Sequence, residues 1–406
     1  MMRENWKRQT FWSLPVFTGD VSGVCSALYE LDGMVVMHDP SGCNSTYNTH
    51  DEIRWMDMES LIFLSGLRDI DAITGNDQKL IDDIAESAAL YHPRFIAIAN
   101  SPVPWLIGTD FRAVCSKVTR MTGIPAFHVE TNAMHDYTYG AGQAFLELAK
   151  MLWEESGSPK EDPAGPAEDA GLAEDVCPAE GSGDGSRRIR VNILGATPLD
   201  FTVREQIWTL KKILADNGFE TVSVWGMGDG LEALRRAPVA DVNLVISSAG
   251  IYAARFMKEK YNIPFAAGIP VGAFRDTLLG ALAEAAKTGQ DQVPYLEVLG
   301  ETRGSSTRAV CGEPVTMGSV AADMALRELA GCDIVCLTET WEGLISEADH
   351  RPQGEEEIRQ VLAGYRDVTA DPMLRIACGQ GTEFHELPHF AYSGRLYLNQ
   401  IKPLIG

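Results

Sequence analysis

The sequence predicts an α/β protein with three Rossmann-like, parallel-sheet domains around a central cleft. Three observations lead to this fold class. Short apolar runs that end in Gly or Pro turns alternate with segments of helical periodicity along most of the 406 residues. The order strand, helix, strand recurs, and this order is typical of βαβ units in a parallel sheet. One stretch that lacks the pattern is rich in Pro, Gly and acidic residues, and it divides the chain.

The first domain, residues 1–153, opens with a helix-like segment and an apolar run at 34–37. A helix at 77–91 is predicted because its apolar residues, Leu80, Ile81 and Ile84 among them, recur at helical spacing. We expect further strands at 71–74, 95–99 and 124–129, and helices at 77–91, 110–122 and 138–155.

Residues 154–187 form a linker that we expect to be disordered, because ten acidic residues and one lysine leave it too charged to bury a core. The remaining two domains repeat the alternation of strands and helices. We expect the second, 188–290, to hold strands at 188–194, 221–225 and 241–248 and helices at 202–217 and 251–261. We expect the third, 291–406, to hold strands at 308–311, 333–338 and 374–378 and helices at 316–330 and 353–365.

Composition excludes several classes of function. The formal net charge of −23 argues against nucleic acid as a partner, although it suits a cationic docking partner. No run of 18 apolar residues is present, so we expect no membrane span. Eight cysteines without an export signal do not form a disulfide framework. We therefore expect a cytoplasmic protein whose thiols are either buried or available to a metal.

Two of these cysteines, Cys25 and Cys43, lie in the stretch 19–55 beside turns rich in small residues. Cys43 ends the turn His38-Asp39-Pro40-Ser41-Gly42-Cys43, which follows an apolar strand. Such a turn delivers a thiol to the edge of a sheet. We expect Cys25 in a second turn, 22–25, where glycine lets the backbone approach a bulky inorganic group. The alternative is that both are buried thiols without a metal.

The pattern HDPSGC, with an earlier cysteine near a glycine, resembles the component 1 proteins of nitrogenase and nitrogenase-like reductases. SPVPWLIGTDF at 101–111 and EKYNIP at 259–264 extend the resemblance. It implies that Cys25 and Cys43 bind a [4Fe–4S] cluster shared across a subunit interface, either with a second copy or with a paralogous component 1 subunit. It also implies a separate ATP-dependent iron–sulfur reductase as electron donor, and a substrate reduced in the interdomain cleft.

The sequence departs from the family at three sites. Ser101 stands where a third cluster cysteine is usual. The residues that would anchor the iron–molybdenum cofactor of nitrogenase are replaced by Ser247 or Ser248 and by Tyr397. The resemblance therefore implies a nitrogenase-like reductase whose substrate is not dinitrogen. Two alternatives stay open: a scaffold for the assembly of a metal–sulfur cofactor, and a relative that binds no cluster.

Polar residues that we place near the cleft are His38, Ser101, Ser247, His385, His389, Arg395 and Tyr397. His38 precedes the turn that bears Cys43 and either bonds a ligand or caps that turn. The two later histidines and Arg395 either line the cleft or cap helices and pair with acids. The sequence names no proton donor among them.

Overall fold

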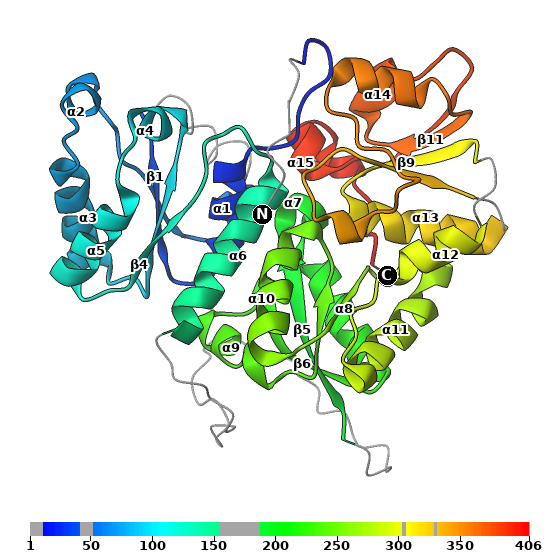
Figure 1. Cartoon of the computed structure of the whole chain (residues 1–406), viewed down its shortest axis with the longest axis horizontal. Coiled ribbons are helices and arrows are strands. Elements are labelled where there is room, and N and C mark those ends of the chain that lie inside the picture. Colours follow the sequence, from blue (N-terminus) through cyan, green and yellow to red (C-terminus); the bar gives the residue numbers. More distant parts are fainter. Residues whose placement is uncertain (1–10, 41–51, 155–186, 303–305, 329–330, 406) are drawn as a thin grey trace.

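The computed structural model describes residues 11–40, 52–154, 187–302, 306–328 and 331–405. Figure 1 shows three parallel four-stranded sheets with flanking helices, one at the left, one in the lower centre and one at the upper right. We call them the first, second and third units. The predicted α/β class with three parallel sheets is confirmed. The linker predicted at 154–187 lies outside the described residues except for its two end residues.

The first unit contains the sheet β2-β1-β3-β4, in which every neighbouring pair is parallel. Its strands are buried except at the edges, as expected for a sheet that helices cover on both faces. Its elements are α1 (Asp20–Leu28), β1 (Met34–His38), β2 (Leu61–Leu64), α2 (Asp69–Thr74), α3 (Gln78–Tyr91), β3 (Ile96–Asn100), α4 (Pro102–Ile107), α5 (Phe111–Thr122), β4 (Ala126–Val129) and α6 (Tyr137–Glu154).

The second unit contains the parallel sheet β6-β5-β7-β8. Its core continues into the first unit through α6, which packs against α1 on one side and α10 on the other. Its elements are β5 (Ile189–Ala196), α7 (Pro198–Phe201), α8 (Arg204–Asp216), β6 (Phe219–Gly226), α9 (Leu231–Arg235), β7 (Val242–Val245), the 3-10 turn η4 (Ser248–Gly250), α10 (Ile251–Tyr261), β8 (Phe265–Ala267), α11 (Arg275–Thr288) and α12 (Pro294–Thr302).

The third unit contains the parallel sheet β10-β9-β11-β12 and the end of the chain. The arm at 11–18 belongs to it, because Leu14 and Phe17 are buried in its core. Its elements are β9 (Arg308–Gly312), α13 (Pro314–Glu328), β10 (Asp333–Cys336), α14 (Glu355–Leu362), β11 (Asp367–Ala370), the 3-10 helix η7 (Pro372–Ala377), β12 (Glu383–Glu386), α15 (Phe390–Ser393) and the 3-10 helix η8 (Gly394–Gln400).

All three sheets have the same strand order, since the second strand of each unit lies on one side of the first and the third lies on the other side. The chain therefore reverses direction across the sheet between the first and third strands, at β1/β3, β5/β7 and β9/β11. Open α/β sheets bind ligands at this switch point, outside the carboxyl ends of the strands. The topology thus marks three short loops after β1, β5 and β9 as candidate positions for function.

Three local predictions from the sequence are wrong. Residues 71–74 belong to helix α2, which Asp69 and Asp71 favour in its first turn and which Gly75 ends at a φ of 64°. Residues 374–378 belong mostly to η7, which starts at Pro372, while the strands of that region are β11 and β12. Cys25 lies inside helix α1 and not in a turn. The sequence analysis also missed strands β2 and β8.

Among the described residues, none of the helices has the length and apolar character needed to cross a bilayer.

Candidate functional site

The carboxyl ends of the three sheets contribute polar residues at equivalent positions. Asp39 follows β1, Asp200 lies four residues after β5, and Glu313 directly follows β9. The third strands are followed by Ser101, by Ser247 and Ser248, and by Asp371. All seven side chains are buried. Buried polar residues at the switch points of all three sheets indicate a site that the fold itself creates, because polar residues without a role usually lie on the surface.

Asp200 joins the three units at one carboxylate. Its Oδ1 accepts a hydrogen bond from the Tyr137 hydroxyl of the first unit and lies 3.2 Å from Nε2 of His389 in the third unit. Burial, together with the Asp200 charge, raises the pKa of Tyr137 far above its usual value, so its hydroxyl stays protonated and donates. We call Tyr137, Asp200 and His389 the junction triad.

His389 has one nitrogen in the triad and one without a partner. Its backbone N–H donates to Asp371 Oδ2 at 2.8 Å, which fixes the start of α15. The ring packs edge-on against Phe17, and only 8% of the residue is exposed. Its Nδ1 makes no hydrogen bond with any residue in the described ranges. Since buried ring nitrogens usually have a partner, this atom is available to a water molecule or ligand.

Glu313 ties the second unit to the third. Its Oε1 accepts from the backbone N–H of Ser248 at 2.8 Å and from the Ser248 hydroxyl, and Oε2 accepts from Thr316 at the start of α13. Burial and repulsion from Asp200 raise the pKa of Glu313, while these donors act in the opposite direction. The buried Asp200 carboxyl at the junction is thus one cause of the raised pKa of Glu313.

Two glycines position Tyr137. Helix α1 crosses α6 so closely that a Cβ on Gly23 would lie 2.3 Å from the Tyr137 carbonyl oxygen. A Cβ on Gly140 would lie 1.9 Å from the Asp20 carbonyl oxygen. Asp20 also accepts hydrogen bonds from Asn132 and Ala133 in the loop that leads into α6. The small residues of α1 therefore set the approach of the helix that carries Tyr137.

The carboxyl edge of the first sheet holds a second polar group. His38 Nδ1 lies 2.8 Å from the Ser65 hydroxyl, and burial lowers the pKa of His38 to about 4, so the ring is neutral at pH 7. His128 lies 2.7 Å from Asn100 Oδ1. The Ser101 hydroxyl is buried and has no hydrogen-bond partner in the described part of the chain. β1, the strand that precedes Cys43 in the sequence, ends at this edge.

Cys25 lies in the core between the sheet and α6. It is fully buried, and burial together with the charge of Glu52 raises the pKa of its thiol. Iron binds thiolates, so Cys25 would have to lose its proton to act as the cluster ligand that the sequence predicts. Cys43 lies outside the described residues. The described residues do not by themselves fit a [4Fe–4S] cluster, since no three His, Cys, Asp or Glu side chains among them are grouped to hold a metal ion.

The other predicted site residues are dispersed. The Ser247 hydroxyl accepts from the Ala249 N–H and caps η4, next to Ser248 at the junction. His385 is half-exposed on the edge strand β12, where Nε2 lies 3.3 Å from Asp367. Arg395 donates to the Glu52 carbonyl oxygen at 3.2 Å, and Tyr397 lies half-buried in η8. Of the predicted cleft residues, only His389 and Ser247 are at the junction or directly beside it.

Sequence reasoning missed Tyr137, Asp200 and Glu313 as site residues. Asp200 and Glu313 do carry a signal, since each is an acid within four residues of the end of an apolar strand and close to a proline. An acid at that position in a parallel sheet is a candidate for the carboxyl edge. Tyr137 has no comparable signal, because a tyrosine at the start of a helix is common in a protein core.

The comparisons with known proteins agree with this fold. The family model described as nitrogenase component 1 type oxidoreductase matches residues 21–303. The chain is 24% identical over 238 residues to the nitrogenase iron-molybdenum cofactor biosynthesis protein NifE of Methanosarcina barkeri, covering 58% of this chain and 47% of that protein. It is 26% identical over 264 residues to a light-independent protochlorophyllide reductase subunit of Synechococcus sp. (strain RCC307), covering 63% and 47%.

The chain thus spans about half the length of the curated relatives it matches. A solved structure described as nitrogenase Cp1 at pH 5 superposes with a TM-score of 0.60 at 15% identity, covering 99% of this chain and 87% of that one. At this identity the likeness shows the fold alone. The family match shows membership of the family as well as the fold. It extends over most of the chain and includes the whole sheets of the first and second units. The chain belongs to the nitrogenase component 1 type oxidoreductase family.

Proposed function

We propose that this chain is a redox subunit of a nitrogenase-like reductase that works in a reducing cytoplasm. It takes electrons from a separate ATP-dependent iron–sulfur reductase, and a substrate other than dinitrogen is reduced at the junction of the three units. One observation carries the proposal. The chain leaves the carboxyl edge of the first sheet at the end of β1 in the direction of Cys43 and at the end of β4 in the direction of Tyr137, so both residues follow strands that end at one edge.

The junction triad supports reduction because reduction of an organic substrate consumes protons as well as electrons. Tyr137 holds a proton on its hydroxyl, and the Asp200 carboxylate orients the His389 ring. The second nitrogen of that ring has no hydrogen bond within the described part of the chain. An imidazole in this setting can pass a proton to a bound group, since its two nitrogens differ in what they contact.

An exposed apolar patch at the carboxyl end of the first sheet supports a partner subunit. Helices α2 and α4 follow β2 and β3, contact each other and lie at the same end of the first sheet (Figure 1). The patch consists of large apolar side chains that are 44–81% exposed: Ile70, Ile73, Trp105, Leu106 and Ile107. Patches of this kind mark interaction sites. We propose that a second component 1 subunit, identical or paralogous, covers it.

A [4Fe–4S] cluster would then lie between the subunits and supply one-electron chemistry, with Cys25 and Cys43 as the predicted ligands from this chain and two more ligands from the partner. Cys25 is fully buried in α1, so its thiol would have to release its proton when iron binds. The six cysteines in the described ranges are all free thiols, which suits a reducing compartment.

The test is iron and sulfide content, with electron paramagnetic resonance, on protein purified and reconstituted without oxygen. We expect about four irons per dimer in the wild type and loss of iron in Cys43→Ala. Cys115→Ala is the matched control, since Cys115 is a buried thiol of α5 and should keep the iron. An iron-free wild type would overturn the electron-transfer proposal. A stable cluster without substrate reduction in the presence of reductase and ATP would favour the scaffold function.

A further inference from the structure

A large cavity lies at the amino edge of the first sheet. It has a volume of about 1050 Å³ and is lined by residues at the amino ends of β1, β2 and β3 together with the end of α1. Its size suits one small organic molecule. Ligands of parallel sheets bind at the carboxyl edge, so this cavity is separate from the junction and does not rest on the proposed function.

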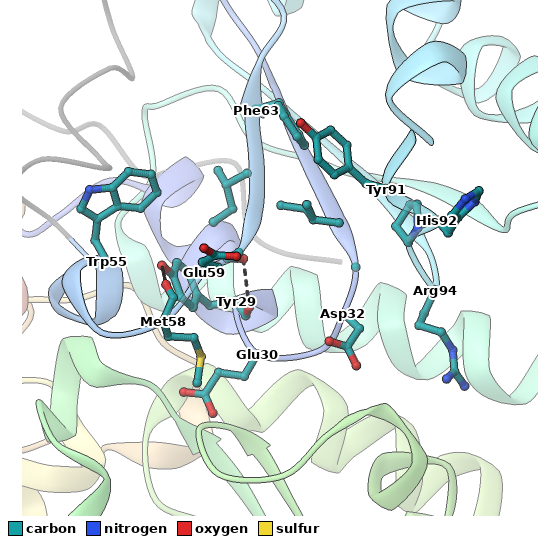
Figure 2. A pocket seen from close by; sticks show the side chains of 15 residues that line it. Tyr29, Glu30, Asp32, Trp55, Met58, Glu59, Phe63, Tyr91, His92 and Arg94 are labelled. Carbon is teal, nitrogen blue, oxygen red and sulfur yellow. Dashed lines mark hydrogen bonds between the residues drawn. The ribbon is translucent and has the colours of Figure 1, made fainter. Parts of the chain in front are cut away.

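The walls of the cavity are aromatic. Figure 2 shows Trp55 on one side of the space and the Phe63 and Tyr91 rings on the other, with Tyr29 between them. The Phe63 and Tyr91 ring centres are 5.6 Å apart. Trp55 and Tyr91 are 41% and 48% exposed, so their faces are accessible. Accessible aromatic faces attract cations because the ring carries negative charge above and below its plane.

The charges around the cavity favour a cation. The carboxylates of Asp32 and Glu59 line it, and neither makes an ion pair with a residue in the described ranges. The basic side chain Arg94 is already paired with Glu232, outside the cavity. Glu30 at the base is balanced by Arg54 at 2.9 Å and Arg204 at 2.6 Å. Asp32 and Glu59, both exposed, therefore add negative charge to the lining beside Trp55 and Tyr91, while the buried Tyr29 ring is already covered by Arg54 at 4.5 Å.

The cavity also favours an organic cation over a metal ion as its ligand. A divalent metal needs several oxygen or nitrogen ligands within about 2–2.6 Å, and no group of three His, Cys, Asp or Glu among the described residues offers this. The volume exceeds what one ion would fill. We propose that this cavity binds a small organic cation with an aromatic or alkyl body, such as an amine or a quaternary ammonium compound.

The test is isothermal titration of the full chain with three probes of similar size: benzyltrimethylammonium, benzyl alcohol and benzoate. We expect the cation to bind at least about tenfold more tightly than either other probe. Trp55→Ala should weaken cation binding about threefold to tenfold, and the double variant Asp32→Asn, Glu59→Gln should weaken it further. Asn is a safe replacement for Asp32, whose φ of 55° it adopts readily.

Matched controls are Trp208→Ala, an exposed tryptophan of α8, and Glu86→Gln, an exposed acid of α3; both should bind the cation as the wild type does. Thermal unfolding of each variant checks that it is folded. Equal affinity for the three probes would overturn the proposal. So would unchanged cation binding in both Trp55→Ala and the double variant.

Discussion

Nε2 of His389 lies 3.2 Å from Oδ1 of Asp200, so a residue near the end of the third unit contacts the switch point of the second. The same oxygen accepts the hydroxyl of Tyr137 from the first unit. One buried carboxylate therefore joins three sheets that are far apart in the sequence. A group placed in this way fixes how the units meet, because it bonds donors from two other units at the carboxyl edge of its own sheet.

Replacing Asp200 by Asn should loosen this arrangement. The amide oxygen carries no charge and so accepts the two bonds more weakly, and the amide nitrogen that replaces Oδ2 cannot accept from Thr197, whose hydroxyl lies 3.5 Å away. A weakened or lost buried hydrogen bond of this kind costs about 1–3 kcal/mol. We expect the free energy of unfolding, measured with urea, to fall by that amount. Asp216→Asn is the control, because Asp216 is exposed at the end of α8 and its replacement should change little. Equal stability of the two variants would contradict the linking role of Asp200.

The sequence predicted the strands of this junction better than it predicted the junction itself. The strands β5, β7 and β9 could be predicted from their apolar runs, because buried parallel strands are continuous hydrophobic segments. The edge strand β12, with the residues Glu383–Glu386, is mostly exposed, and only its pairing with β11 makes it a strand. Local spacing cannot predict such a strand.

The triad could not be predicted for the same physical reason. Tyr137, Asp200 and His389 are 63 and 189 residues apart, and their contact depends on how three separately wound sheets pack. The interpretation of Cys25 failed differently. The small residues around it looked like a turn, but they serve a helix crossing, where small side chains let two backbones approach.

That crossing gives a sharp prediction for Gly23. Its replacement by Ala places a methyl group 2.3 Å from a backbone carbonyl, which cannot move without shifting α6. We expect the free energy of unfolding to fall by about 1–3 kcal/mol or more. Gly280→Ala in α11 is the matched control, since nothing lies within 4 Å of the added atom. That variant should gain about 0.4–1 kcal/mol. Urea titrations of both variants measure the free energies of unfolding. An unchanged value for Gly23→Ala would mean that the helices have room to separate.

The arm at 11–18 makes stability depend on acid pH through Glu355. Its carboxylate accepts the backbone N–H groups of Trp12, Ser13 and Leu14 at 2.7–3.0 Å. These bonds, led by the one from Leu14, hold the pKa of Glu355 well below its usual value. The folded protein therefore releases this proton more readily than the unfolded chain. The stabilisation is present above about pH 4.3 and is lost as the pH falls through the folded pKa.

Glu355→Gln should accordingly be less stable than the wild type at pH 7, and the difference should shrink as the pH is lowered below about 4. Urea unfolding at several pH values measures both curves. Glu356→Gln, one residue further along α14 and exposed, controls for the loss of a charge at the helix start. A constant difference between wild type and Glu355→Gln across this range would show that the carboxylate does not anchor the arm through its charge.

The final prediction concerns Cys25, whose two possible roles give opposite results. A thiol that is fully buried among apolar side chains, with its pKa raised by that burial, behaves as a small apolar residue. In that role Cys25→Ala would keep the iron that Cys43→Ala loses, while its free energy of unfolding would fall by about 1 kcal/mol. Cys25→Ser should be less stable still, because its hydroxyl would be buried in the core. Iron content and urea unfolding are measured on the same preparations. The proposed cluster requires the opposite result: a folded Cys25→Ala should lose its iron as Cys43→Ala does, because the four-thiolate site of a dimer needs both cysteines.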